Sequence, residues 1–230
     1  YFYGQKERET EGTAVNKIKI KSDGILSDPF GTGHMGLTAE TIAAQYGFSR
    51  SELDSFAAES QRRAAYAQQQ GFFDEQIAPV SVQSRQSEVW VRKDEHLRPE
   101  TTIDSLSTLK AAFKKDGLVT AGNASGLNDG AAALVLTSQS EANRLGVAPQ
   151  ARIVGYSFAG VEPALMGLGP IPAVQKLLSQ TGVRLEQIDV IESNEAFASQ
   201  AMAVSQTLGF DSAKVNPNGG AIALGHPVGA

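Results

Sequence analysis

The stretch QIDVIESNEAFASQAMAVSQTLG, residues 187–209, changes its hydrophobic period half-way along. A short apolar run typical of a strand comes first, and apolar residues at helical spacing follow it. The same order occurs upstream, where the strand-like ARIVGYSFAG (151–160) precedes the helix-like IPAVQKLLSQTG (171–182). Strands that alternate with helices predict a layered α/β fold, in which loops at the strand ends carry the function.

The composition is that of a globular protein, and it limits the partners. With 230 residues, 41% of them hydrophobic and 20% charged, the chain can form one large domain or two small ones. A net charge of -5 without a basic patch argues against nucleic acid and anionic membranes, whereas local donors could still bind an anionic small molecule. No apolar run approaches the roughly eighteen residues of a membrane span, and no signal-peptide core is present, so we expect a cytoplasmic protein. The chain contains no cysteine, which excludes disulfides and thiolate metal sites.

One long helix is predicted early in the chain. Ser49 and Glu52 have the spacing of a capping box, and they open a helical pattern over residues 49–73. We interpret Arg62 and Arg63, within this pattern, as part of a solvated face.

The middle of the chain is rich in loops and small residues. Alternating apolar residues at 80–82 and 89–91 predict two short strands, and His96, in a charged loop, is expected to be exposed. Residues 117–138 are almost all small, and the apolar run at 131–136 suits a buried strand. A backbone with so few large side chains favours close approach by another group.

The glycine-rich stretch NGGAIALGHPVGA (218–230) carries His226, whose imidazole can take a proton near neutral pH. Pro227 suits the first position of a helix, and the positive end of such a helix would favour the neutral imidazole that a base requires. A structural, helix-capping histidine is the alternative. Asn194 could likewise be an ordinary N-cap of the helix that follows it, or combine capping with a functional role.

Several stretches together resemble the thiolase family, and in particular its acetyl-CoA acetyltransferases. They are GHMGLTAE (33–40), TAGNASGLNDGAAA (120–133), MGLGPIPA (166–173), SNEAFASQ (193–200) and NPNGGAIALGHPVGA (216–230). The resemblance covers residues 23–230 and is specific, because NEAFA and GGAIALGHPVGA are rare strings. It implies a partial thiolase-like αβαβα layered fold with a loop-rich α+β insertion domain.

The resemblance also implies a domain organisation. Residues 1–128 would form a loop domain that binds coenzyme A (CoA), and residues 129–146 the last strand and helix of the N-terminal thiolase half. Residues 147–230 would form the first part of the C-terminal half.

The family's chemistry condenses two molecules of acetyl-CoA to acetoacetyl-CoA and CoA, or runs the reverse thiolysis. A cysteine is acylated, a second cysteine handles the proton of the attacking carbon, and a histidine activates the first cysteine. Here His226 matches that histidine, and Asn194 matches the asparagine whose bound water donates to an oxyanion. CoA thioesters are the substrates, and neither a further cofactor nor a metal is implied.

The substrate-binding residues that the resemblance implies line a narrow groove. Arg98 would lie near the adenine or phosphate end of CoA and Ser125 near the pantetheine amides. Small residues at 121–126 would let the backbone close on the pantetheine. The complete set is Leu26, His34, Met35, Arg98, Ser105, Phe113, Ala121, Ser125, Leu127, Met166, Ala196 and Phe197.

Both cysteines of the family lie outside the region that this sequence matches. We therefore expect a fragment, inactive by itself, of an enzyme that is a homodimer or homotetramer in complete form. Residues 1–21 depart from the family pattern and could include foreign sequence. Three alternatives stay open: a catalytically dead CoA-binding module, a lipid-carrier relative and a longer-chain 3-ketoacyl-CoA thiolase, although Met35 and Met166 match the short-chain branch better.

Overall fold

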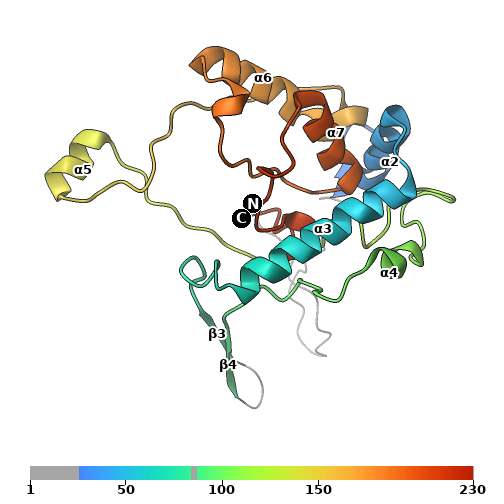
Figure 1. Cartoon of the computed structure of the whole chain (residues 1–230), viewed down its shortest axis with the longest axis horizontal. Coiled ribbons are helices and arrows are strands. Elements are labelled where there is room, and N and C mark those ends of the chain that lie inside the picture. The colour runs from blue at the N-terminus through green and yellow to red at the C-terminus, as the bar shows by residue number, and fades with distance from the viewer. Residues whose placement is uncertain (1–25, 84–86, 230) are drawn as a thin grey trace, which may run out of the picture.

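The structure, a computed structural model, describes residues 26–83 and 87–229 (Figure 1). Its elements in chain order are β1 (Ser27–Asp28), β2 (Gly33–His34), α2 (Met35–Tyr46), α3 (Arg50–Gln69), β3 (Val80–Gln83), β4 (Glu88–Val91), α4 (Ile103–Ser107), α5 (Gln139–Leu145), the 3-10 turn η1 (Pro163–Leu168), α6 (Pro170–Thr181), the 3-10 turn η2 (Leu185–Gln187), α7 (Ala198–Leu208) and α8 (Ala221–Leu224). Most of this regular structure is helical. None of the described helices is long and apolar enough to cross a membrane.

One apolar core joins helices that are far apart in the sequence. α2 packs against α7 and η1, and α3 packs against α4, α7 and α8. Ile42 of α2, Leu53 of α3 and Ala198 of α7 are fully buried there, and Ile222 of α8 is 2% exposed. Burial of each large side chain contributes about 1.5–3 kcal/mol, so this core fixes α2 and α3 against α7 and α8.

Local signals set the helix boundaries near the core. Ser49 caps α3 as the spacing predicts: its hydroxyl accepts the Glu52 N–H, and the Glu52 carboxylate accepts the Ser49 N–H at 2.7 Å. His34 is the N-cap of α2, and its Nδ1 accepts the Gly36 N–H at 3.0 Å. Gly47 is the C-cap, where φ of +70° favours glycine.

The two described sheets are short antiparallel ribbons. β1 pairs with β2, and β3 pairs with β4 in the register Val80↔Val91 and Val82↔Val89. The β3–β4 pair confirms the two strands predicted from alternation, and Figure 1 shows it projecting away from the helices.

Two predicted strands do not form in the structure. Residues 131–136 are extended but unpaired, and Leu134, Val135 and Leu136 are 88%, 97% and 73% exposed. Residues 151–160 are likewise irregular. A buried parallel strand needs hydrogen-bonded neighbours and covering helices, and no described segment supplies them. Figure 1 accordingly shows α5 apart from the core, at the end of two extended segments.

Several predictions for the last third of the chain need correction. α6 confirms the predicted helix, but the strand expected before α7 is reduced to one bridge between Ile191 and Val215. α7 begins at Ala198 with Phe197 at the N-cap, so Asn194 caps no helix. Only residues 228 and 229, which form a turn, are described after Pro227, so the helix expected there stays a prediction.

Candidate active site

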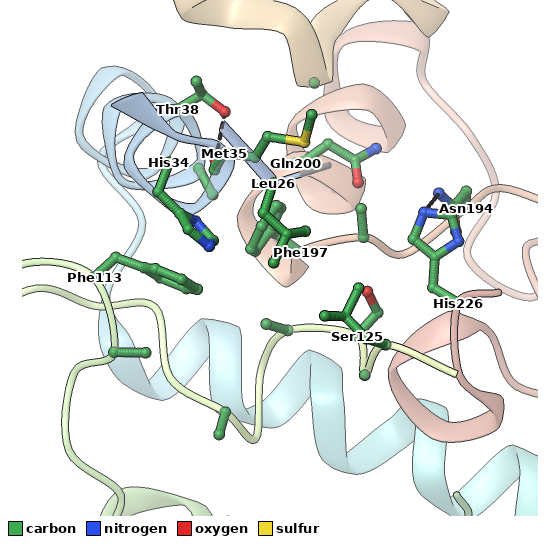
Figure 2. Close-up of a pocket in the computed structure, with 18 of the residues that line it drawn as sticks. Leu26, His34, Met35, Thr38, Phe113, Ser125, Asn194, Phe197, Gln200 and His226 are labelled. Carbon is green, nitrogen blue, oxygen red and sulfur yellow. Dashed lines mark hydrogen bonds between the residues drawn. The ribbon is translucent and has the colours of Figure 1, made fainter. Parts of the chain in front are cut away.

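A pocket of about 680 Å³ opens where α2, the loop at 120–127, the loop before α7 and His226 meet (Figure 2). Its volume is in the range of small-molecule sites. All the candidate residues named from the sequence line it, except Ser105. These are Leu26, His34, Met35, Arg98, Phe113, Ala121, Ser125, Leu127, Met166, Asn194, Ala196, Phe197 and His226.

Ser105 lies elsewhere, at the start of α4. Its hydroxyl donates to the Thr102 carbonyl at 2.8 Å, and its N–H donates to the Thr102 hydroxyl at 3.1 Å. This capping box occupies the hydroxyl, so the structure does not bring Ser105 to the pocket.

Aromatic side chains form one wall of the pocket. The rings of His34 and Phe113 stack with their centroids 4.6 Å apart, and Phe113 meets Phe197 edge-on at 6.0 Å. Gly36 is needed beneath them, because a methyl group there would overlap the Phe113 ring. In Figure 2 these rings lie across the pocket from Asn194 and His226.

Asn194 and His226 form the polar end of the pocket. Asn194 Nδ2 lies 3.3 Å from His226 Nε2. A carboxamide nitrogen only donates, so this Nε2 accepts and the proton of a neutral imidazole is on Nδ1. Burial lowers the pKa of His226 below its usual 6.5, which also favours the neutral ring. The direction agrees with the prediction, but its cause is burial instead of a helix end.

The backbone of His226 is fixed independently of its ring. Its N–H donates to the Gly126 carbonyl at 3.2 Å and to Asn128 Oδ1 at 3.1 Å, and the same segment bridges to Leu127. The imidazole therefore projects from a fixed position into the pocket.

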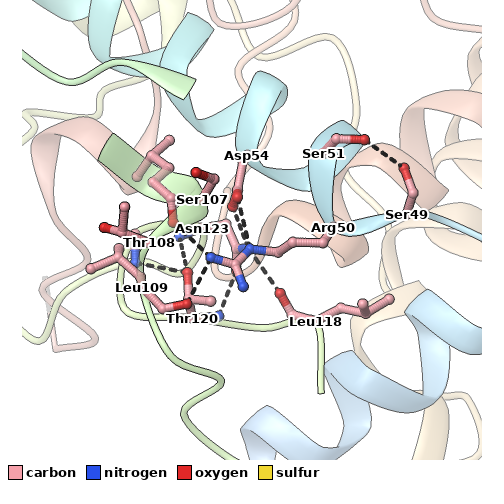
Figure 3. Close-up of polar contacts among 12 residues, drawn as sticks. Ser49, Arg50, Ser51, Asp54, Ser107, Thr108, Leu109, Leu118, Thr120 and Asn123 are labelled. Atoms are coloured by element: carbon pink, nitrogen blue, oxygen red, sulfur yellow. Dashed lines mark hydrogen bonds and ion pairs between the residues drawn. The ribbon is translucent and has the colours of Figure 1, made fainter. Parts of the chain in front are cut away.

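The loop that carries Ala121 and Ser125 is anchored by a buried polar network (Figure 3). Asn123 is 1% exposed; its amide donates to Asp54 Oδ1 at 2.9 Å and to the Leu118 carbonyl at 3.0 Å. Its oxygen accepts the Thr120 N–H at 2.8 Å. Every polar atom of the Asn123 carboxamide thus has a partner, which holds this loop in one conformation.

Sequence reasoning missed part of the lining. Thr38 and Ile42 follow Met35 at helical spacing on α2, so periodicity alone could have revealed that face. His96 was expected to be exposed, but it is half-buried in the pocket lining, and a methyl group at Gly126 would overlap its ring. Gln200 also lines the pocket from the first turn of α7. The described residues contain no group of three His, Asp or Glu side chains that could hold a metal ion.

Comparison with protein families accounts for almost all of the chain. Residues 5–140 match the thiolase N-terminal domain, and residues 147–230 match the thiolase C-terminal domain. The chain belongs to the thiolase family. This membership agrees with the resemblance seen in the sequence. The two matched domains together contain all the residues that line the pocket.

Individual thiolases show the same relationship. Acetyl-CoA acetyltransferase of Pseudomonas aeruginosa is 53% identical over 206 residues, 89% of this chain and 52% of that protein. The crystal structure of the Bacillus anthracis acetyl-CoA acetyltransferase has a TM-score of 0.88 and 50% identity, over 90% of this chain and 52% of that one. Human mitochondrial 3-ketoacyl-CoA thiolase in complex with CoA has a TM-score of 0.85 and 40% identity, over 94% and 56%. The structure is therefore a partial thiolase fold, and the chain spans about half the length of the thiolases it matches.

Proposed function

We propose that this pocket binds a CoA thioester, and that the protein acts as a thiolase of the acetyl-CoA acetyltransferase type. The observation that carries the proposal is the Asn194–His226 pair at one end of a pocket with apolar and aromatic walls. Such walls suit pantetheine and a short acyl chain, while the polar pair meets the thioester carbonyl. The human thiolase complex with CoA supports the same class of ligand.

In this proposal the two residues have different tasks. His226 Nε2 gives up its contact with Asn194 and accepts the proton of a cysteine thiol, whose sulfur attacks the thioester carbonyl and forms the acyl–sulfur bond while CoA leaves as a thiolate. The thiolate then takes the proton from His226, so the step balances. The Asn194 amide donates, directly or through a water, to the oxygen on which negative charge develops. In the second step the other cysteine takes a proton from the methyl carbon of another acetyl-CoA, the resulting carbanion attacks the acyl-cysteine carbonyl, and the acyl–sulfur bond breaks so that the first cysteine leaves as a thiolate.

This sequence contains no cysteine, so the 230-residue chain by itself can perform only the binding part. A CoA-binding module without catalysis is the second candidate, since it would use the same pocket. Residues 1–128 would act as the CoA-binding loop domain, and residues 129–146 and 147–230 would belong to the two thiolase halves. We expect a cytoplasmic homodimer or homotetramer for the complete protein. The third candidate is a thiolase that prefers a longer acyl chain. Binding measurements with acyl-CoA molecules of increasing chain length would distinguish it from an acetyl-CoA acetyltransferase.

Calorimetric titration of the purified chain with CoA and acetoacetyl-CoA tests the binding part. Arg98→Ala is expected to weaken CoA binding about tenfold through loss of a phosphate or adenine contact. Arg92→Ala is the matched control, because Arg92 lies over the Trp90 ring on the β3–β4 ribbon and outside the pocket lining. If the unmodified chain does not bind CoA at millimolar concentration, the proposal is rejected. If Arg98→Ala and Arg92→Ala lose CoA affinity equally, the assignment of this pocket is rejected.

Thiolysis is tested separately, by adding CoA to acetoacetyl-CoA and following its consumption. We expect no turnover by the 230-residue chain. Turnover without any cysteine would overturn the acyl-cysteine mechanism. A full-length protein that binds CoA and shows no thiolysis would establish the binding module instead.

A further inference from the structure

A buried carboxylate lies directly beside Asn194 in the chain, and the mechanism above does not use it. Glu195 is 3% exposed. Ser60 donates its hydroxyl proton to Glu195 Oε2 at 2.6 Å, and the Ile222 N–H donates to the same oxygen at 3.3 Å. Asn216 Nδ2 donates to Oε1 at 2.8 Å. All these partners are donors, which is the set that an ionised, acceptor-only carboxylate requires.

The partners come from three segments that are separate in the sequence. Ser60 belongs to α3, Asn216 to the turn before α8, and Ile222 to α8 itself. α8 ends at Leu224, and His226 follows it by two residues. One carboxylate therefore connects the loop that presents Asn194 with the helix that leads to His226.

Gly220 packs directly against this carboxylate. A methyl group at Gly220 would overlap the Glu195 carboxylate. The Gly220 N–H donates to Ser60 Oγ at 3.1 Å, so the hydroxyl that donates to Glu195 is itself held in place. Asn216 also binds the backbone of Ser193, the residue before Asn194. Its Oδ1 accepts the Ser193 N–H at 2.7 Å, and its amide donates to the Ser193 carbonyl at 2.8 Å.

We propose that Glu195 is a positioning residue: its carboxylate sets the distance between Asn194 and His226 by tying their two segments to one another. The inference deepens the proposed function, since the pair matters only if it acts on a thioester. The positioning itself can be measured without substrate. The contact with Asn194 and the burial of His226 both affect one quantity, the pKa of the His226 imidazole.

The test is an NMR titration of the three histidines in the purified chain. Three variants keep the negative charge and disturb its position: Glu195→Asp is too short for all its donors, Ser60→Ala removes one donor, and Gly220→Ala displaces the carboxylate. Each is expected to raise the pKa of His226 toward its usual 6.5, because the Asn194 contact weakens and water enters. The NMR signals of the His34 ring, across the pocket, should have the same positions as in the unmodified chain.

Ser199→Ala is the matched control. Ser199 and Ser60 are 1% and 3% exposed, and each donates one hydrogen bond across two elements, Ser199 to the Ala39 carbonyl at 2.9 Å. The control is expected to lose similar stability and to leave His226 unchanged. An unchanged His226 in the Ser60 and Gly220 variants, or an equal shift in Ser199→Ala, would overturn the inference. If Glu195→Asp does not fold, as judged by circular dichroism, the other two variants decide. CoA binding, measured on the same samples, tests the proposed function separately.

Discussion

Asn194 Nδ2 donates to His226 Nε2 across 3.3 Å, and so it stabilises the neutral imidazole. A hydrogen bond to the neutral form of a base lowers its pKa, in addition to the effect of burial. Asn194→Ala is therefore expected to raise the pKa of His226, measured by NMR. Asn218→Ala, at a half-buried position in the turn before α8, serves as the control and should cause no change. A lower pKa in Asn194→Ala would contradict the donor role.

Stability should depend on pH through the same histidine. Because its pKa is lowered in the folded state, the unfolded chain binds this proton more readily. The His226 contribution is complete above the unfolded pKa of about 6.5 and is lost as pH falls from there through the folded value. Urea midpoints at pH values on either side of 6.5 would measure it. A His226→Gln variant should lose that part of the pH dependence, and an identical pH profile in both proteins would disprove the assignment.

The Asn123 network makes a larger contribution to stability. Asn123→Ala would leave the Asp54 oxygen and the Leu118 carbonyl without this donor inside the protein. A loss of about 2 kcal/mol in the free energy of unfolding is expected, together with weaker CoA binding, because the loop with Ala121 and Ser125 loosens. Asn123→Asp should cost more, since it places a second carboxylate beside Asp54. Urea denaturation and calorimetry give the two quantities; a loss in stability with unchanged CoA affinity would separate the network from the pocket.

Phe113 should be sensitive to a single methyl group on α2. Gly36→Ala ought to stabilise an isolated helix, yet here the methyl overlaps the Phe113 ring and displaces it from His34. We expect at least a severalfold loss of CoA affinity. Thr41→Ala, on the exposed face of the same helix, is the control with no expected effect on binding. Equal affinities in the two variants would show that the aromatic wall does not contact the ligand.

Arg62 and Arg63 are adjacent but unequal. The hydrogen bond from Arg62 is the main reason that the pKa of Glu59 falls to about 2, yet Arg62 is 67% exposed and solvent screens this pair. Arg63 is 21% exposed and also donates to the carbonyls of Val215 and Ser212. Arg62→Ala is expected to change the unfolding free energy by less than about 0.5 kcal/mol, and Arg63→Ala to lower it by about 1–3 kcal/mol. Equal unfolding free energies in urea would contradict this ranking.

The sequence predicts best where the deciding interaction is local. The Ser49–Glu52 capping box and the alternation in β3 and β4 involve neighbours along the chain, and the structure contains both. The strand expected at 131–136 depends on distant partners, and periodicity carries no information about whether they are present. The solvated role given to Arg63 was wrong for a similar reason, since its carbonyl acceptors lie about 150 residues away.

The candidate site was predictable mainly from motif order. Motifs at distant positions carry residues that the structure brings to one pocket, whereas Ser105, assigned from the resemblance and outside every quoted motif, lies in a capping box elsewhere. The Glu195 contacts and the burial of His96 were not visible in the sequence, because both depend on how the loops pack.

The fixed position of His226 also has a consequence for the order of folding. Its N–H reaches back 98 residues to Asn128, and Ser60 and Glu195 are separated by 135. Closing such long loops is slow and entropically costly, so local helices such as α3 form first and the site last. During synthesis on the ribosome, α3 can fold early, whereas the pocket acquires its base only when residue 226 has left the exit tunnel.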